Sequence, residues 1–220
     1  MISEVEGEAF AQKDLGVTDN IKRECFTPTQ DKQLFPFSLS LFPSEEATRA
    51  AAERALQEGL QLYQQGTAES LQQAIVKFEE ALPLYHAVED SRSEAAILNN
   101  IGQVYSDLGE KRKALDYFNQ SLSLSKAVGD KAGEAVVLDN IGQGYNALGE
   151  KQKALDYFNQ SLSLRRAVGD KAGEAHTLTN IGAVYSDLGE QQKALDYYSQ
   201  SLPIFRAVAE RNGEAKLLRS

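Results

Sequence analysis

Apolar residues recur at steps of three and four along most of the chain after residue 45, which is the spacing of one face of an α-helix. Residues 131–170 contain two such stripes. The first consists of Leu138, Ile141, Gly142, Tyr145 and Leu148, and the second consists of Ala154, Leu155, Phe158, Ser161, Leu162 and Leu164. Gly149 and Gly169 follow the two stripes, and glycine readily adopts the left-handed conformation that ends many helices. This stretch therefore predicts a helical hairpin.

The hairpin pattern is repeated at a period of 40 residues. Three segments that begin at Asn100, Asn140 and Asn180 read NIGQVYSDLGE, NIGQGYNALGE and NIGAVYSDLGE. A single hairpin cannot bury both of its apolar stripes, whereas stacked hairpins bury them in a continuous core. The sequence therefore predicts an all-α fold, a right-handed α-solenoid of stacked helical hairpins. We place repeats at about 45–90, 91–130, 131–170 and 171–210, and a partial repeat at 211–220.

Residues 1–44 differ from the array and are predicted to form a linker or an extended segment. They are polar and weakly periodic except for the decamer LFPFSLSLFP at 34–43. The decamer lies far from Met1 and contains Pro36, which argues against a signal-peptide core. Two interpretations stay open: a plain linker, or a strand-like segment that folds back onto the first hairpins or into a groove of the array.

The residues at the packing positions resemble a known family. In the repeat at 91–130 they are Leu98, Ile101, Gly102, Tyr105, Ala114, Phe118 and Ser121. This spacing resembles the tetratricopeptide repeat, although that family usually has a period of 34 residues. The longer period resembles the arrays of kinesin light chains and Pins-type scaffolds. The segment EGLQLYQQGTAESLQQAI resembles cyanobacterial proteins in which such arrays precede a caspase-like CHAT domain.

The resemblance implies a protein–protein interaction scaffold that is not an enzyme and that binds a peptide or partner segment in a concave groove. The alternative is the sensory or regulatory part of a larger enzyme, such as a caspase-like protease. The match of residues 211–220 to the start of a repeat favours a fragment of a longer protein over a terminal cap. An uncovered end of the stack would also expose an apolar face for self-association.

In the family the first helix of each repeat lines the groove, so the resemblance implies a ligand-facing stripe there. The candidate groove residues are Asn100, Gln103, Asp107, Asn140, Gln143, His176, Asn180 and Asp187. A carboxamide both donates and accepts hydrogen bonds, so a row of asparagines is suited to pair with the backbone of an extended peptide. The alternatives are a solvated polar position, or asparagines that bond to the neighbouring repeat.

Charge and composition narrow the range of partners. The net charge of −9 argues against nucleic acid and against an anionic membrane, because both attract clustered Lys and Arg. Asp107, Asp139 and Asp187 favour an acidic groove and hence a neutral or basic peptide, with ordinary surface charge as the open alternative. His86 and His176 are isolated, so we expect no metal and no cofactor. The single cysteine, Cys25, favours a reducing, cytoplasmic location.

Overall fold

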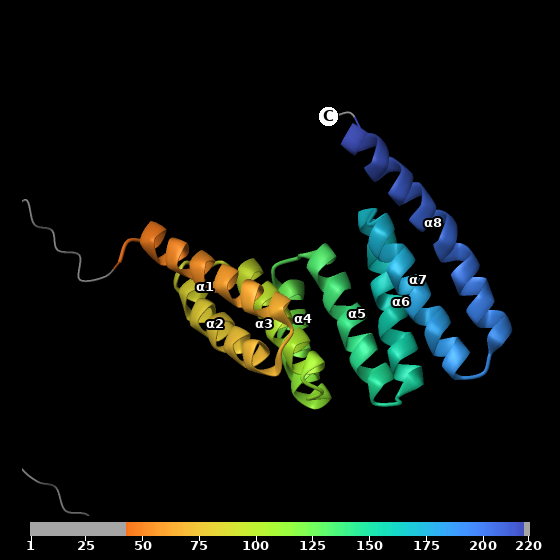
Figure 1. Ribbon diagram of the computed structural model, residues 1–220, viewed down its shortest axis with the longest axis horizontal. Coiled ribbons are helices and arrows are strands. Elements are labelled where there is room, and N and C mark those ends of the chain that lie inside the picture. Colours follow the sequence, from red (N-terminus) through yellow and green to blue (C-terminus); the bar gives the residue numbers. More distant parts are fainter. Residues whose placement is uncertain (1–42, 218–220) are drawn as a thin grey trace, which may run out of the picture. The chain divides into compact units, whose positions relative to one another are not determined.

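The computed structural model describes residues 43–217, with side chains up to residue 209. This part of the chain contains eight α-helices and no β-strand (Figure 1). The helices are α1 (Glu45–Gln65), α2 (Ala68–Ala87), α3 (Ser91–Asp107), α4 (Lys111–Ala127), α5 (Lys131–Ala147), α6 (Lys151–Val168), α7 (Lys171–Asp187) and α8 (Gln191–Leu217). The decamer at 34–43 lies, except for Pro43, outside the described residues, so its two interpretations stay predictions.

The helix ends are fixed by residues whose type suits the position. The Ser44 hydroxyl accepts a hydrogen bond from the Ala47 amide at the start of α1, and Gly66 ends that helix with a φ of 69°. Asp170 accepts a hydrogen bond from the Gly173 amide at the start of α7, at 2.9 Å. A side-chain acceptor at this position satisfies one of the free amides of the first helical turn. The short turns thus force consecutive helices into hairpins.

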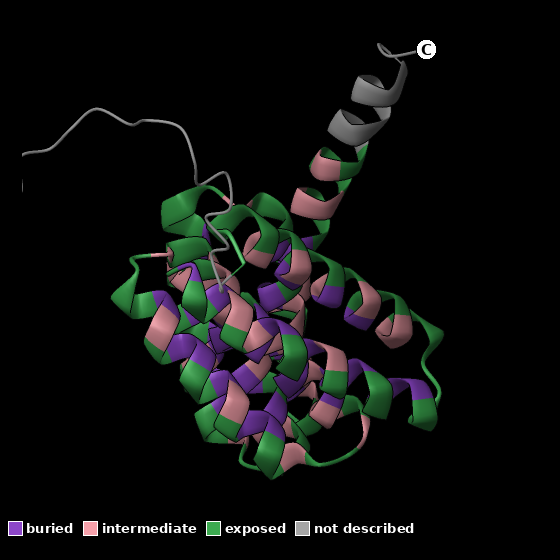
Figure 2. Cartoon of the chain, turned by 90° about the vertical axis from the view of Figure 1, so that its left-hand side faces the viewer, coloured by how far each residue is buried: buried purple, intermediate pink, exposed green. Residues whose placement is uncertain are grey.

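The hairpins stack in chain order. Each odd-numbered helix packs against the even-numbered helix that follows it, and each even-numbered helix packs against the next odd-numbered one. α5 also contacts α3 and α7. Buried residues lie where helices face one another, and exposed residues lie on the outer faces (Figure 2). The predicted all-α solenoid of stacked helical hairpins is confirmed.

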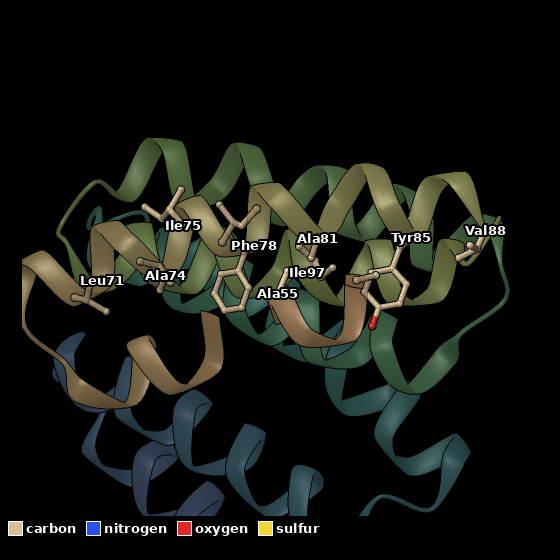
Figure 3. Close-up of a cluster of buried hydrophobic side chains, with 12 residues drawn as sticks. Ala55, Leu71, Ala74, Ile75, Phe78, Ala81, Tyr85, Val88 and Ile97 are labelled. Atoms are coloured by element: carbon tan, nitrogen blue, oxygen red, sulfur yellow. The ribbon is translucent and has the colours of Figure 1, made fainter. Parts of the chain in front are cut away.

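The core repeats with the helices. Phe78, Phe118 and Phe158 are at most 1% exposed, and each lies within its own hairpin beside a glycine of the first helix. A Cβ atom built on Gly142 would lie 2.7 Å from the Phe158 ring, closer than real Cβ contacts. Figure 3 shows the first cluster, in which Phe78 of α2 lies near Ala55 of α1. The repeated spacing of glycine and aromatic residues therefore sets how closely the two helices of a hairpin approach.

Buried hydroxyl groups join the two helices of each of the last three hairpins. The Ser121 hydroxyl donates to the backbone oxygen of Ala95, at 2.7 Å. Ser161 and Ser201 make the same hydrogen bond to Ala135 and Ala175, at 2.8 Å in both cases. A small residue with a donor fits this position because the helices are too close for a larger side chain and the buried hydroxyl needs an acceptor.

The last helix differs from the sequence-based expectation. The repeat placed at 171–210 implies that its second helix ends before residue 211, but α8 continues without a break to Leu217. Ala209 and Glu210 stand where Gly169 and Asp170 end α6 and begin α7 one repeat earlier. Gly169 ends α6 with a φ of 75°, which alanine adopts only under strain. The partial repeat at 211–220 thus has no helix boundary of its own before Leu217.

Candidate peptide-binding groove

The repeated asparagines lie at the contacts between neighbouring hairpins. The Asn140 amide donates to the Asn99 side-chain oxygen at 2.8 Å, and the Asn180 amide donates to the Asp139 carboxylate at 3.0 Å. Both asparagines are only partly buried. Their hydrogen bonds correspond to the second alternative that the sequence left open, an asparagine bonded to the neighbouring repeat. Each carboxamide nevertheless retains a second N–H and a carbonyl oxygen.

Asn100 differs from the other two asparagines. The residue equivalent to Asn99 and Asp139 in the preceding repeat is Leu56, since Gly59 packs on Phe78 as Gly102 packs on Phe118, and a leucine side chain cannot accept a hydrogen bond. Within residues 43–209, no side-chain hydrogen bond of Asn100 is found. Asn100 therefore presents the same group on the same face without the cross-repeat hydrogen bond.

Asp139 does not contribute an acidic groove surface, which corrects the prediction that it does. Its side chain is buried between α5 and α7, where the residue is 5% exposed. The carboxylate accepts hydrogen bonds from Thr177 at 2.9 Å, from Asn180 at 3.0 Å and from Gln143 at 3.2 Å. Burial raises the pKa of Asp139 above its ordinary value, although these hydrogen bonds and nearby Arg165 act in the opposite direction.

The other two predicted groove carboxylates are exposed and take part in local contacts. Asp107 accepts from the Tyr63 hydroxyl of α1 at 2.7 Å and from the Gln103 amide at 3.0 Å. Burial, followed by the hydrogen bond from Tyr63 to Asp107, raises the pKa of Tyr63 to about 12. Asp187 forms an ion pair with Lys151 of α6, at 2.5 Å. The negative charge of Asp107 and Asp187 is therefore partly offset within the array.

The remaining candidates are Gln143 and His176. Gln143 is exposed on α5 and bonds to Asp139 below it. The exposed His176 ring lies edge-on against Phe205 of α8, with ring centroids 4.8 Å apart. The stripe thus passes along α3, α5 and α7. Its side chains are polar on α3, whereas on α7 the stripe includes the His176 ring that packs on Phe205 of α8.

A pocket lies beside this stripe and was not predicted. It has a volume of about 340 Å³ and is formed by residues of α3, α4 and α5, including Asn100, Ser125, Asp130 and Val136. We call it the Ser125 pocket. The signal that could have revealed it is the change at one repeat position, which is Ser125, Arg165 and Phe205 in successive copies. A small residue in one copy leaves space that a larger one fills in the next.

Two further features bear on the possible chemistry. In the part of the chain that the structure describes, no group of three or more His, Cys, Asp or Glu side chains is arranged to hold a metal ion. Among the same residues, no helix has the length and apolar character needed to cross a membrane.

Several solved structures have the same fold. The crystal structure of MamA is 18% identical over 76% of this chain and 89% of that chain, with a TM-score of 0.56. The apo form of RapI is 21% identical, with a TM-score of 0.66. Aspartyl phosphate phosphatase F from Bacillus subtilis is 17% identical, also with a TM-score of 0.66. The aligned region spans 76% of this chain but only 45% and 43% of the latter two, and at these identities the likeness shows the fold alone.

The sequence comparisons agree with this fold. No curated protein matches the chain significantly. The family model described as Tetratricopeptide repeat matches residues 67–127 and 133–207, which together make up more than half of the chain. These two blocks cover the second helix of the first hairpin and most of the three hairpins that follow. The chain belongs to the tetratricopeptide repeat family.

Proposed function

We propose that the array binds an extended protein or peptide segment along the stripe of α3, α5 and α7, and that it acts as a scaffold rather than as an enzyme. Repeat proteins of this kind present extended binding surfaces, and the family in general mediates protein binding. The observation that carries the proposal is the row of partly exposed carboxamides at Asn100, Asn140 and Asn180, one in each of the last three repeats.

The hydrogen bonds across the repeats support this function. Those from Asn140 to Asn99 and from Asn180 to Asp139 hold two carboxamides in fixed orientations. A fixed side chain loses less conformational entropy when it binds a ligand than a free one does. Since the second N–H and the carbonyl oxygen of each carboxamide remain, the row offers donors and acceptors at repeat spacing to a peptide backbone.

The array itself contains a matched test of this role. Asn100→Ala removes one carboxamide without breaking a cross-repeat hydrogen bond, so we expect weaker partner binding at an unchanged thermal midpoint. Each lost hydrogen bond is worth about 0.5–1.5 kcal/mol, or roughly two- to tenfold in affinity. Asn140→Ala removes a cross-repeat bond as well, so we expect it to lower both affinity and stability.

Partners are first captured with the full chain, and affinities for one purified partner are then measured by calorimetry beside thermal unfolding of each variant. If Asn100→Ala leaves the affinity unchanged while Asn140→Ala lowers only stability, the asparagines are purely structural and the groove is not the binding surface. The finer resemblance to kinesin light chain arrays, and the alternative of a regulatory part of a caspase-like enzyme, stay predictions.

A further inference from the structure

The Ser125 pocket has a filled counterpart one repeat along the chain. At the junction of α5, α6 and α7, Arg165 takes the place of Ser125, and the residue is only 8% exposed. Its Nε donates to the Ser161 hydroxyl at 3.2 Å, and one terminal nitrogen donates to the Asp170 carboxylate at 2.5 Å. The array therefore already contains one guanidinium bound between two repeats.

Space for that guanidinium comes from a glycine. A Cβ atom built on Gly173 would lie 1.6 Å from the terminal nitrogen of Arg165, so no side chain could share the site. The equivalent residue at the Ser125 pocket is Gly133, which lines that pocket. The room made by the glycine is thus present in both copies, but Ser125 is too short to fill it.

The groups that bind Arg165 also have equivalents at the Ser125 pocket. Ser121 corresponds to Ser161, and Asp130 corresponds to Asp170. Asp130 uses Oδ1 to accept from the Gly133 amide at 3.0 Å, as Asp170 uses Oδ1 for Gly173. The other oxygen, Oδ2, holds the guanidinium in the filled copy. In the Ser125 pocket this oxygen faces only a loose ion pair with Arg92, at 3.6 Å.

Arg92 lines the pocket but does not fill it. Its side chain is 71% exposed, and its Nε lies beyond ordinary hydrogen-bond distance from Asp130. The equivalent residues in the next two repeats are Ala132 and Ala172, so this cation is not part of the repeated packing. A partner that brings its own guanidinium would displace an exposed side chain, at small cost.

We propose that the Ser125 pocket binds the arginine side chain of a partner segment, whose guanidinium pairs with Asp130 and Ser121 as Arg165 pairs with Asp170 and Ser161. This inference rests on the proposed groove function, because Asn100 of the stripe also lines the pocket. The pocket would make the groove select partners with an arginine at one position, beside α3, α4 and α5. Asn99 replaces the buried Asp139 here, so the pocket has one carboxylate, Asp130, where the filled copy has two near its guanidinium.

The test uses pentapeptides Ac-Ala-Ala-X-Ala-Ala-NH2, with X as arginine, citrulline, lysine or phenylalanine, titrated into the isotopically labelled full chain. We expect the arginine peptide to shift the amide signals of Gly133 and Asp130. Citrulline has the same shape without the charge and should bind about tenfold more weakly, because hydrogen bonds to charged groups are the stronger ones. Phenylalanine binding as tightly as arginine would overturn the proposal in favour of an apolar pocket, as Phe205 in the last repeat would suggest.

Two variants test the pocket through the stability of the chain as well as through peptide binding. Ser125→Arg supplies an internal guanidinium, so we expect a higher thermal midpoint and loss of the arginine-specific signal shifts. Ser123→Arg adds the same charge at an exposed position of α4 and should change neither. An unchanged or lower midpoint for Ser125→Arg, together with intact arginine binding, would overturn the proposal.

The outcomes separate this inference from the proposed function. Because Asn100 also lines the pocket, Asn100→Ala should weaken all four peptides, whereas Ser125→Arg should affect only the arginine peptide. Equal binding of arginine and citrulline peptides, both sensitive to Asn100→Ala, would leave the groove function standing and remove the arginine pocket. Absence of peptide binding to the natural chain at millimolar concentration would count against both.

Discussion

Single glycine residues set the spacing of the helices. Two glycines of α5 illustrate this, because each faces a different neighbouring side chain. Gly142 faces the ring of Phe158, which is 1% exposed and has no room to move. A Cβ atom built on Gly144 would lie 2.8 Å from a methyl group at the end of the Leu115 side chain. The equivalents of Gly144 in the neighbouring repeats are Val104 and Val184, both fully buried. The space at residue 144 is therefore taken by Leu115.

We expect Gly142→Ala to destabilise the protein by about 1–3 kcal/mol, because the added methyl group forces a buried ring to shift. Gly144→Ala is the matched control. Both changes gain about 1 kcal/mol of helix propensity, but the Leu115 methyl group can rotate away, so we expect Gly144→Ala to be nearly neutral. Urea unfolding followed by circular dichroism measures both. A larger loss for Gly144→Ala than for Gly142→Ala would contradict this account.

At the scale of helices, the features that recur in several repeats could be predicted from the sequence, whereas those found in a single repeat could not. Apolar periodicity and the glycines predicted the last three hairpins, because these copies carry the same signals. The burial of Asp139 was not predictable, since the equivalent residues Asn99 and Thr179 are ordinary polar residues. Whether a residue beside the apolar stripe faces solvent or the next hairpin depends on the rotation of the neighbouring helix, which a single repeat does not reveal.

Two features were not predicted from the repeated pattern, the length of helix α8 and the Ser125 pocket. The end of α8 was misplaced because repetition suggested a boundary, although Ala209 lacks the conformational freedom of Gly169. The pocket was missed because it is defined by a side chain that is small where its counterpart, Arg165, is large. The sequence contains both differences, but their consequence depends on packing between repeats.

Asp139 should make the contact between α5 and α7 sensitive to pH. Since burial raises its pKa in the folded chain, the folded state holds the proton to a higher pH than the unfolded state does. The contribution of Asp139 to the free energy of unfolding therefore falls as pH rises from its ordinary value through the raised one. Relative to Asp139→Asn, we expect the natural protein to gain stability as the pH is lowered from 7 toward 4.

The measurement is the difference in thermal midpoint between the two proteins at each pH. Asparagine is a suitable replacement because Asn99 occupies the equivalent position and accepts from Asn140. Asp116→Asn, at an exposed position on α4, serves as the control for a change of net charge. A midpoint difference that is constant with pH, or that moves the other way, would mean that Asp139 is not desolvated in solution.

At the scale of the whole array, the last helix differs from the other second helices of the hairpins. The leucine face that α6 presents to the next hairpin is buried, whereas the equivalent face of α8 is exposed in the described part of the chain. Leu155 of α6 is 4% exposed because α7 covers it, whereas the equivalent Leu195 of α8 is 60% exposed. Leu202 is 52% exposed, although its equivalent Leu162 is 6% exposed. An exposed apolar face of this kind is typical of a surface that another element or molecule covers.

We therefore expect Leu155→Ala to cost about 2–5 kcal/mol, the usual range for a buried leucine, and Leu195→Ala to change stability by less than about 0.5 kcal/mol. Thermal unfolding of both variants at two protein concentrations a hundredfold apart checks this. If the natural chain self-associates through α8, its midpoint rises with concentration and Leu195→Ala removes that rise, because association stabilises the folded state by mass action. A cost for Leu195→Ala equal to that of Leu155→Ala at the lower concentration would instead mean that residues of this same chain cover the α8 face in solution.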